Sequence, residues 1–494
     1  MHRIAFDNNK YIKLQSEHIK ERIASFDNKL YLEFGGKLFD DNHASRVLPG
    51  FKPDSKLQML LALKEHVEII IAVSAHDIEK NKVRSDLGIT YDAEVLRLID
   101  AFRLSGLFVG SVCITQYSNQ QAALAFKKRL GKLGVKCYFH YIIDGYPYNL
   151  DLIVSKDGFG KNQYVETEKP LVVVTAPGPG SGKMAVCLSQ LYHDHENGLK
   201  SGYAKFETFP IWNLSVKHPV NLAYEAATAD LNDVIMIDPY HLEAYNEVTV
   251  NYNRDIEVFP VLNSILTSIS GKSIYQSPTD MGVNMIGYCI IDDDVVQESA
   301  KAEIIRRYYR AVYENIFEDG SVEAVSKIEG LMKQLDISTN DRKVVQAALD
   351  KAKKTSLPAL AIELEDGQII CAKTTPLLSA SAALLLNALK YLAGIEKKML
   401  LLSPSLLEPV TDLKLNSFGN TNPRLHADEI LIVLSIAATN NPFAQLALKQ
   451  IPRLKNCEVH SSVLLSPADE YCYSRLGINL TSEAISQAKK LYRK

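Results

Sequence analysis

The sequence predicts an α/β protein in which mostly parallel sheets are covered by helices. Short apolar runs of strand length alternate with helical patterns along most of the 494 residues, as in parallel sheets. A glycine-rich turn joins a strand to a helix near the middle, and a hairpin signal opens the last third. This length suits two to four domains. We expect an N-terminal α/β unit over 1–165, a P-loop-like α/β unit with a helical tail over 166–335, and a smaller C-terminal α/β unit over 336–494.

Alternation is clearest in the first predicted unit. The runs "EIIIAVSA", "LFVGSVCITQ" and "KCYFHYIID" are typical of buried strands, and helical patterns cover 56–66 and 119–133. The polar stretch "SKDGFGKNQYVETEKP" then reads as a linker or surface loop. It marks the predicted end of the unit.

The second predicted unit begins with a strand at 171–175. Further strands are expected at 233–238, 255–260 and 287–294, with a helix between the last two, around 261–268. The region from Val295 to Leu335 is rich in helix formers. It therefore forms the helical tail of this unit.

The third predicted unit has the strongest local signals. Asp366-Gly367 lies between two apolar runs, which predicts a hairpin. The segment "SASAALLLNALKYLAG" is apolar on nearly all sides and predicts a buried helix. Ser466 and Pro467 follow a strand-like run and have the residue types of an N-cap and a first helical position.

Composition narrows the class of protein. Hydrophobic residues make up 47% and charged residues 23% of the chain, and the formal net charge is −3, which gives no electrostatic footprint for nucleic acid or an anionic membrane. No apolar run reaches the length of a membrane span, and the N-terminus lacks a signal-peptide pattern. The seven cysteines contain no C-x-x-C pair. We expect a cytoplasmic protein with reduced thiols, no nucleic-acid partner and no membrane partner; a homo-oligomer is compatible with the sequence.

The turn in "LVVVTAPGPGSGKMAVCLSQLYHDHENG" predicts an anion site. A β-branched strand enters a turn without Cβ atoms at three positions, and the free N–H groups and dipole of the following helix attract phosphate. The pattern departs from G-x-x-x-x-G-K-[ST], because Pro177 occupies the first glycine position and Met184 cannot place a hydroxyl on Mg²⁺. The alternative is a tight strand-to-helix turn with a solvated lysine. The predicted phosphate-binding residues here are Gly178, Gly180, Ser181, Gly182 and Lys183.

A metal site is predicted at the end of the strand "VIMID". Asp238 has the position of the aspartate that holds Mg²⁺ in P-loop enzymes, so Mg²⁺ with ATP or another nucleotide is the expected cofactor. An ordinary helix cap is the competing interpretation, and the acids 292–294 are the alternative metal site. Arg254, in the loop "NYNRD", is a further candidate for binding phosphate, although loop polarity alone also explains it.

The stretch "YLEFGGKLFDDNHASRVLPGF" is dense in chemically active side chains. Lys37 and Arg46 are candidates for binding phosphate, and His43 with Asp40 or Asp41 for acid–base catalysis. A hairpin with a charged loop is the alternative. We expect this segment to face the Lys183 turn, so that the site spans the first two units.

Several long segments together resemble one bacterial family. They include "EFGGKLFDDNHASRVLPGF", "VVVTAPGPGSGKMAVCLSQLYH", "YAKFETFPIWNL", "KHPVNLAYEAATADL", "DPYHLEAYN", "VNYNRDIEVFPVL", "SPTDMGVNMIGYCIIDD" and "CEVHSSVLLSPADE". The resemblance is to the domain-of-unknown-function 1846 family, also called uncharacterised protein family 0371, and covers almost the whole chain. It implies a cytoplasmic bacterial protein and a glycine-rich turn that belongs to the family pattern, but it supplies no reaction.

Two classes of function follow from these residues. The first is an enzyme that binds a nucleotide or another small phosphorylated ligand and carries out phosphoryl or nucleotidyl transfer, or a ligation. The second is a non-catalytic ligand sensor or assembly protein that uses the same turn as an anion site. Acid–base residues beside the turn favour the enzyme, and a site without carboxylates in reach of a metal favours the sensor.

Overall fold

The computed structural model describes residues 3–36, 38–39, 41–84 and 87–487, which group into two compact units. The N-terminal unit consists of Ile4–Glu225 and Asp233–Ala300. The C-terminal unit consists mainly of residues from Lys301 onward, with the short segment Ala226–Asn232. Within the described ranges, no helix combines the length and the apolar character needed to cross a bilayer.

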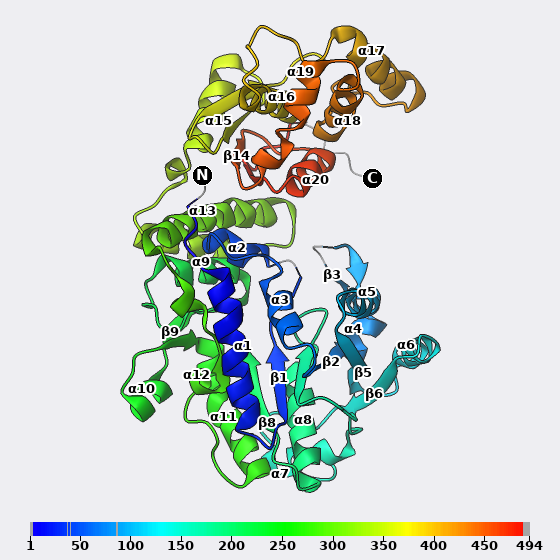
Figure 1. The fold of residues 1–494 in the computed structure, drawn as a ribbon, viewed down its shortest axis with the longest axis vertical. Helices are drawn as coiled ribbons and strands as arrows, with labels where there is room; N and C mark the ends of the chain where they lie inside the picture. Colours follow the sequence, from blue (N-terminus) through cyan, green and yellow to red (C-terminus); the bar gives the residue numbers. More distant parts are fainter. Residues whose placement is uncertain (1–2, 37, 40, 85–86, 488–494) are drawn as a thin grey trace. The chain divides into compact units, whose positions relative to one another are not determined.

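A seven-stranded sheet forms the centre of the N-terminal unit (Figure 1). Every recorded pairing within it is parallel, which confirms the predicted α/β class. The strand order is β11-β8-β1-β7-β2-β5-β6. The strands are β1 (Leu30–Phe34), β2 (Val67–Ser74), β5 (Phe108–Tyr117), β6 (Lys136–Tyr141), β7 (Leu171–Thr175), β8 (Gly202–Phe206) and β11 (Gly282–Val283).

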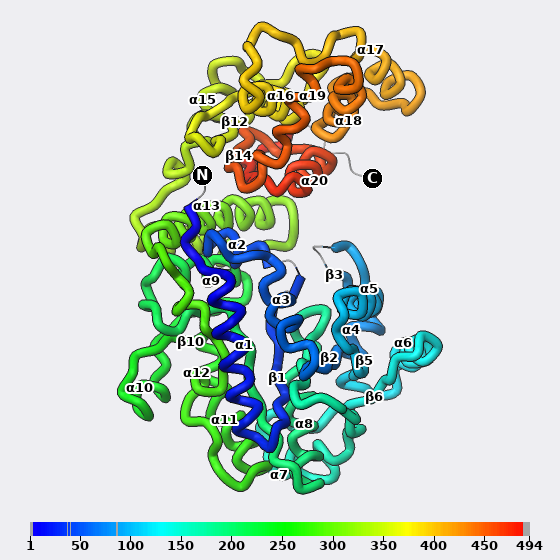
Figure 2. Tube along the Cα trace, viewed as in Figure 1, coloured from blue at the N-terminus to red at the C-terminus, as the bar shows by residue number. Residues whose placement is uncertain are grey.

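Strand β7 occupies the middle of this sheet although it comes late in the chain. It pairs with β1 on one side and β2 on the other, so the chain leaves β1 in one direction and leaves β7 in the opposite direction. In Figure 2 the dark blue trace at β1 runs beside green parts of the chain, which come much later in the sequence. The predicted boundary near residue 165 therefore falls inside one sheet, because strands from both predicted units alternate in it.

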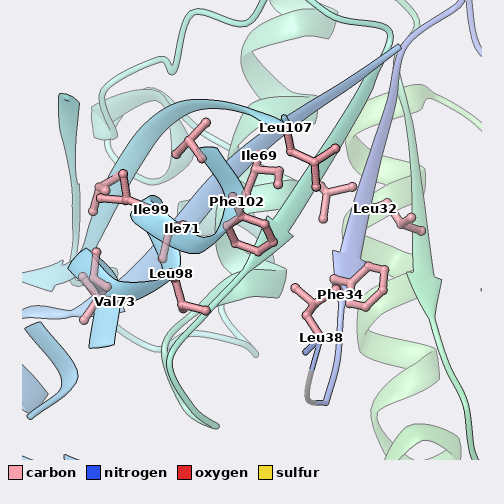
Figure 3. Close-up of a cluster of buried hydrophobic side chains, with 14 of the residues drawn as sticks. Leu32, Phe34, Leu38, Ile69, Ile71, Val73, Leu98, Ile99, Phe102 and Leu107 are labelled. Carbon is pink, nitrogen blue, oxygen red and sulfur yellow. The ribbon is translucent and has the colours of Figure 1, made fainter. Parts of the chain in front are cut away.

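One face of the sheet carries the larger apolar core. Alternate side chains of β1 and β2 contact apolar residues of helices on this face, as Figure 3 shows for Phe34, Ile71 and Phe102. Phe34 also stacks on Phe206 of β8, with ring centroids 4.0 Å apart. The covering helices include α1 (Asn8–Ala24), α3 (Ser55–Ala62), α4 (Ala75–Glu79), α5 (Tyr91–Leu104) and α6 (Gln121–Lys132).

The opposite face is covered by α8 (Lys183–Glu196) and α11 (Asn253–Ser270). Helix α8 packs on β1, with β7 and β8 on either side, and α11 packs beside α8. A buried hydrogen bond connects α8 to the sheet, because the Tyr31 hydroxyl donates to the Asp194 carboxylate of α8 at 2.9 Å. The N-terminus of α8 therefore lies over the carboxyl end of β1.

Shorter elements complete the N-terminal unit, some of them outside the main sheet. Strands β9 and β10 pair antiparallel in a separate two-stranded sheet, as do β3 and β4. Helices α9 (Pro219–Ala227) and α13 (Asp293–Phe317) have residues in both units. The others are α2 (Asn42–Val47), β3 (Val83–Arg84), β4 (Ile89–Thr90), α7 (Leu150–Ile153), β9 (Ile235–Ile237), α10 (Pro239–Tyr245), β10 (Val250–Tyr252) and α12 (Pro278–Met281).

Two predicted strands of this region are wrong. Residues 255–260 belong to helix α11, which continues through Pro260, and 287–294 form a short 3-10 helix followed by the start of α13. A short apolar run does not distinguish a strand from a buried helix segment. In α13 the acids stabilise the helix start, and Asp292 accepts a hydrogen bond from the Val295 backbone.

The C-terminal unit contains a mixed four-stranded sheet, in the order β13-β12-β14-β15. The predicted hairpin at Asp366-Gly367 is confirmed, as is the helix capped by Ser466, which accepts from the Asp469 backbone. The strands are β12 (Ala359–Glu363), β13 (Ile369–Lys373), β14 (Glu458–Ser461) and β15 (Asn479–Ser482). The helices are α14 (Val322–Gln334), α15 (Lys343–Thr355), α16 (Ala380–Leu392), α17 (Pro404–Asp412), α18 (Ala427–Ala437), α19 (Pro442–Leu448) and α20 (Pro467–Arg475).

Candidate functional site

The strand order places a topological switch point between the carboxyl ends of β1 and β7. In open parallel sheets, ligands bind where neighbouring strands send their connections in opposite directions, outside the carboxyl ends. Here the connection after β1 contains Gly35-Gly36, and the connection after β7 is the predicted phosphate turn. Two segments singled out in the sequence therefore meet one edge of one sheet.

The turn after β7 is fixed by close packing. A Cβ at Gly178 would lie 2.2 Å from the hydroxyl of the buried Tyr91, so a larger residue there requires the turn or Tyr91 to move. The buried Ser181 hydroxyl donates to the Gly178 carbonyl at 2.9 Å, and the Thr115 hydroxyl donates to the Ser181 carbonyl at 2.8 Å. The Ser181 hydroxyl thus closes the turn, which is a structural role that the sequence interpretation did not assign.

The helix start that follows this turn has free donors. Gly182 has φ +80° and immediately precedes α8. Among the described residues, none of the backbone N–H groups from Gly180 to Ala185 donates a hydrogen bond, and the Lys183 ammonium has no carboxylate within 4.0 Å. The unsatisfied N–H groups and the helix dipole together favour an anion.

A cluster of charged side chains occupies the sheet face beneath α8. The register aligns Lys205 of β8 with Glu33 of β1, so both side chains lie on that face. The Lys205 ammonium lies 2.8 Å from Glu207 and 2.5 Å from Asp255, in the first turn of α11. Tyr203 donates to Glu33 at 2.7 Å. We call these five residues the β8 cluster.

Helix α8 begins at the Lys183 turn and packs on the sheet face that carries the β8 cluster. Burial raises the pKa of the Cys187 thiol in α8 well above its ordinary value; Glu33 adds to this rise and Lys183 opposes it. Cys187 lies one turn after Lys183, so charges of both the turn and the cluster act on the first turns of α8.

Glu207 is the member of the cluster best suited to proton transfer. Its side chain is 8% exposed, and within the described part of the chain its Oε2 atom has no hydrogen-bond partner. Burial raises the pKa of Glu207 to about 7; Lys205 opposes the rise and Asp255 adds to it. Burial alone would lower the pKa of Lys205, but Asp255 and Glu207 raise it above its ordinary value. A carboxyl group that titrates near neutrality suits a general acid or base.

This raised pKa predicts a pH-dependent stability. The folded protein binds the Glu207 proton more tightly than the unfolded chain, so the stability that Glu207 contributes is lost as pH rises from about 4.5 to about 7. Glu207→Gln removes this dependence. We measure the free energy of unfolding of both proteins by urea denaturation. As pH rises through that window, we expect the value for the variant minus the value for the parent to increase by up to about 1.4 kcal/mol per pH unit. A pH-independent difference contradicts the assignment.

The connection after β1 is only partly described. Lys37 and Asp40 lie outside the described residues. The predicted hairpin alternative is wrong, because β1 leads into helix α2. Asp41 accepts from the Ala44 backbone as the α2 cap and lies 2.7 Å from the Lys56 ammonium. Burial alone would raise the pKa of Asp41, but Lys56 holds it below the ordinary value.

His43 of α2 packs against aromatic rings. Its ring makes edge contacts with Phe209, 5.4 Å away, and Tyr224, 5.5 Å away, beyond the carboxyl end of β8. Arg46 lies in the last turn of the same helix. Both residues belong to the same compact unit as Lys183, so the expectation of a site between two units is corrected: the segments are loops at one edge of a single sheet.

The predicted metal ligand Asp238 has a structural role. Strand β9 lies outside the main sheet, so Asp238 does not share an edge with Lys183. One carboxylate oxygen caps α10, accepting from the backbones of Tyr240 and His241, and the other accepts from the backbone and hydroxyl of Thr279. This fully bonded, buried carboxylate does not fit an Mg²⁺ ligand, and the expectation is wrong.

The alternative acids do not form a metal centre either. Asp292 caps α13, and Asp293 lies 3.0 Å from the His218 ring. In the ranges that the structure describes, no group of three or more histidine, cysteine or acidic residues is arranged to hold a metal ion.

The predicted anion contact of Arg254 is also replaced by an internal partner. Its guanidinium makes two contacts with the buried Asp233 carboxylate, at 2.5 and 2.8 Å. The charge of Arg254 is thus engaged within the protein, because burying Asp233 without a cation would be costly.

Sequence reasoning missed most of the β8 cluster. Lys205 and Glu207 alternate in "YAKFETF", which places them on one face of a strand. That alternation of opposite charges inside an otherwise apolar strand was the available signal. Asp255 could not be found this way, because it follows 50 residues later and was assigned to a strand.

The fold and site define a two-unit α/β protein with a glycine-rich strand-to-helix turn at the switch point of a parallel sheet. The models for "Domain of unknown function DUF1846, N-terminal" and "Domain of unknown function DUF1846, C-terminal" match residues 4–336 and 340–492. The chain belongs to the DUF1846 family. It is 55% identical to the UPF0371 proteins of Streptococcus uberis, Streptococcus pyogenes serotype M5 and Streptococcus pneumoniae strain JJA, over 494 residues and the full length of each.

Proposed function

We propose that this protein binds a phosphorylated ligand, such as a nucleotide, at the turn before α8, and that the β8 cluster supplies acid–base chemistry to it. One observation carries the proposal. Within the described structure, the backbone N–H groups from Gly180 to Ala185 donate no hydrogen bond, and the neighbouring Lys183 has no carboxylate partner. Phosphate is the ligand that such a helix start favours. The turn is held rigid by Tyr91 and Thr115, so little ordering is needed on binding.

The β8 cluster favours an enzyme over a sensor. Glu207 combines burial, a free carboxyl oxygen among the described contacts and a pKa of about 7. Such a group accepts a proton from a nucleophile that attacks the phosphorylated ligand, in a phosphoryl or nucleotidyl transfer or a ligation. The proposal includes no protein-held Mg²⁺, because Asp238 is engaged in four hydrogen bonds.

A non-catalytic ligand sensor is the second candidate. It is favoured by the lack, in the described part of the chain, of a carboxylate group arranged to hold a metal. In that case the β8 cluster stabilises the fold and the turn alone binds the ligand.

The Lys183→Ala variant tests ligand binding. We expect it to weaken binding of ATP or inorganic phosphate by about tenfold to a hundredfold, the range of a hydrogen bond to a charged group. Native mass spectrometry of the purified protein identifies a co-purified ligand, and titration calorimetry gives the affinities. Lys200→Ala, an exposed lysine beyond the other end of α8, is the matched control.

Outcomes separate the two functions. Equal affinities for Lys183→Ala, Lys200→Ala and the parent overturn the anion site. The enzyme is supported if the parent turns over the ligand, and if Glu207→Gln binds the ligand with equal affinity but does not turn it over. If the parent binds without turnover, the sensor is supported instead.

A further inference from the structure

The C-terminal unit contains a cavity of about 500 Å³, lined by residues of that unit. Its walls come from α15, β13, the turn after β13, α16, the 399–402 segment and α17, all within this unit. This volume falls within the usual range for small-molecule sites.

Apolar side chains form most of the wall. Among the lining residues, Leu401, Leu402 and Leu407 are buried, and Leu386 and Met399 are partly buried. An apolar molecule that displaces water from such a surface gains the hydrophobic free energy of burial.

The charged residues that line the cavity all have the same sign. They are Lys351, Lys373 and Lys390, and none of the described residues that line it is acidic. The Lys390 ammonium donates to the Lys397 carbonyl at 2.6 Å and to the Met399 carbonyl. Among the described residues, Lys351 and Lys373 have no carboxylate within 4.0 Å. Two lysine charges at the cavity are therefore free to attract an anion.

We propose that this cavity binds an amphiphilic anion, such as a fatty carboxylate, with its apolar chain against the leucines and its headgroup at Lys351 and Lys373. A free inorganic anion would not bury the apolar wall, and a neutral hydrocarbon would leave both lysines uncompensated. The occupant thus needs both parts. This inference is independent of the phosphate site, because every lining residue belongs to the C-terminal unit.

Titration calorimetry of the full-length protein with decanoate, below its micelle-forming concentration, tests the proposal. We expect one decanoate per chain and at least tenfold weaker binding of decyltrimethylammonium, which has the same chain and the opposite charge. Acetate, the headgroup alone, should give no measurable binding. Equal affinity for the two amphiphiles, or several molecules per chain, overturns the proposal.

Variants locate the binding. Leu386→Trp fills the cavity from a partly exposed position and should abolish decanoate binding, while Lys351→Glu with Lys373→Glu should weaken it at least tenfold. Lys353→Glu, an exposed residue of the same helix α15 outside the cavity, is the control and should bind as the parent does. Circular dichroism verifies that each variant folds. Unchanged decanoate binding in the folded Leu386→Trp protein overturns the proposal. A parent protein that is a dimer, and that this substitution dissociates, also overturns it, because a second copy of the chain would then cover the cavity.

Discussion

Lys205→Met lowers the free energy of local unfolding around β8 by about 3 kcal/mol at pH 8. The substitution preserves most of the apolar stem but leaves Glu207 and Asp255 without their shared cation, 2.8 and 2.5 Å away. Removing one partner of a buried ion pair costs about 3–5 kcal/mol, and the low end applies because a quarter of the Lys205 side chain is exposed. Native-state hydrogen exchange of the β8 amides measures this loss locally, which suits a chain with two compact units.

The pH dependence of this loss provides an internal check. Glu207 takes up a proton as pH falls through its pKa, which burial raises to about 7 in the parent and which the loss of Lys205 raises further, so one of the two unpaired charges disappears. The destabilisation should therefore be smaller at pH 5.5 than at pH 8. Lys200→Met, at an exposed lysine, should leave the β8 amides unchanged. A Lys205→Met protein as stable as this control would show that the β8 cluster contributes no net stabilisation.

Gly178→Val destabilises the turn after β7 by about 3 kcal/mol, the upper part of the usual range for overpacking. Even a Cβ would lie 2.2 Å from the Tyr91 hydroxyl and 2.7 Å from its ring, and Tyr91 is itself buried. The turn or the tyrosine must move. Urea denaturation measures the stability, and phosphate titration measures whether the displaced turn still binds an anion.

A second glycine of the same turn gives the comparison. A Cβ at Gly180 would meet nothing within 4 Å, and only its φ of +74° disfavours other residues. Gly180→Ala should therefore cost about 1–2 kcal/mol, the backbone strain alone. If Gly178→Val is no less stable than Gly180→Ala, packing against Tyr91 does not explain the glycine at 178.

Local signals predicted the elements that short sequences can specify. The β-branched run before Gly178 and the helix after Gly182 formed as expected, and so did the hairpin at Asp366-Gly367. In each case the turn residues and the periodicity indicate the same structure. The run at 255–260 predicts a strand but forms a helix. Its apolar residues suit a strand and a helix equally, and proline ordinarily ends a helix.

The arrangement of the site depends on contacts that local patterns do not contain. Lys205 and Asp255 become partners only when α11 packs on the sheet. Asp238 ends an apolar strand as a metal-binding aspartate would, but that strand lies outside the main sheet and the carboxylate caps a helix. Sequence reasoning therefore found the turn and the segment after β1 but not the acid–base cluster beneath them.

The central position of β7 also determines when this unit can fold. During synthesis β1 leaves the ribosome about 140 residues, and β2 about 100 residues, before Leu171–Thr175, the segment that must pair with both of them. Until then each presents an unpaired edge to the other or to neighbouring chains, which is a hazard for aggregation. A chain that ends at residue 165 would retain these open edges and should not fold independently. Formation of the sheet thus waits for a pairing between distant segments, which slows folding relative to locally connected folds.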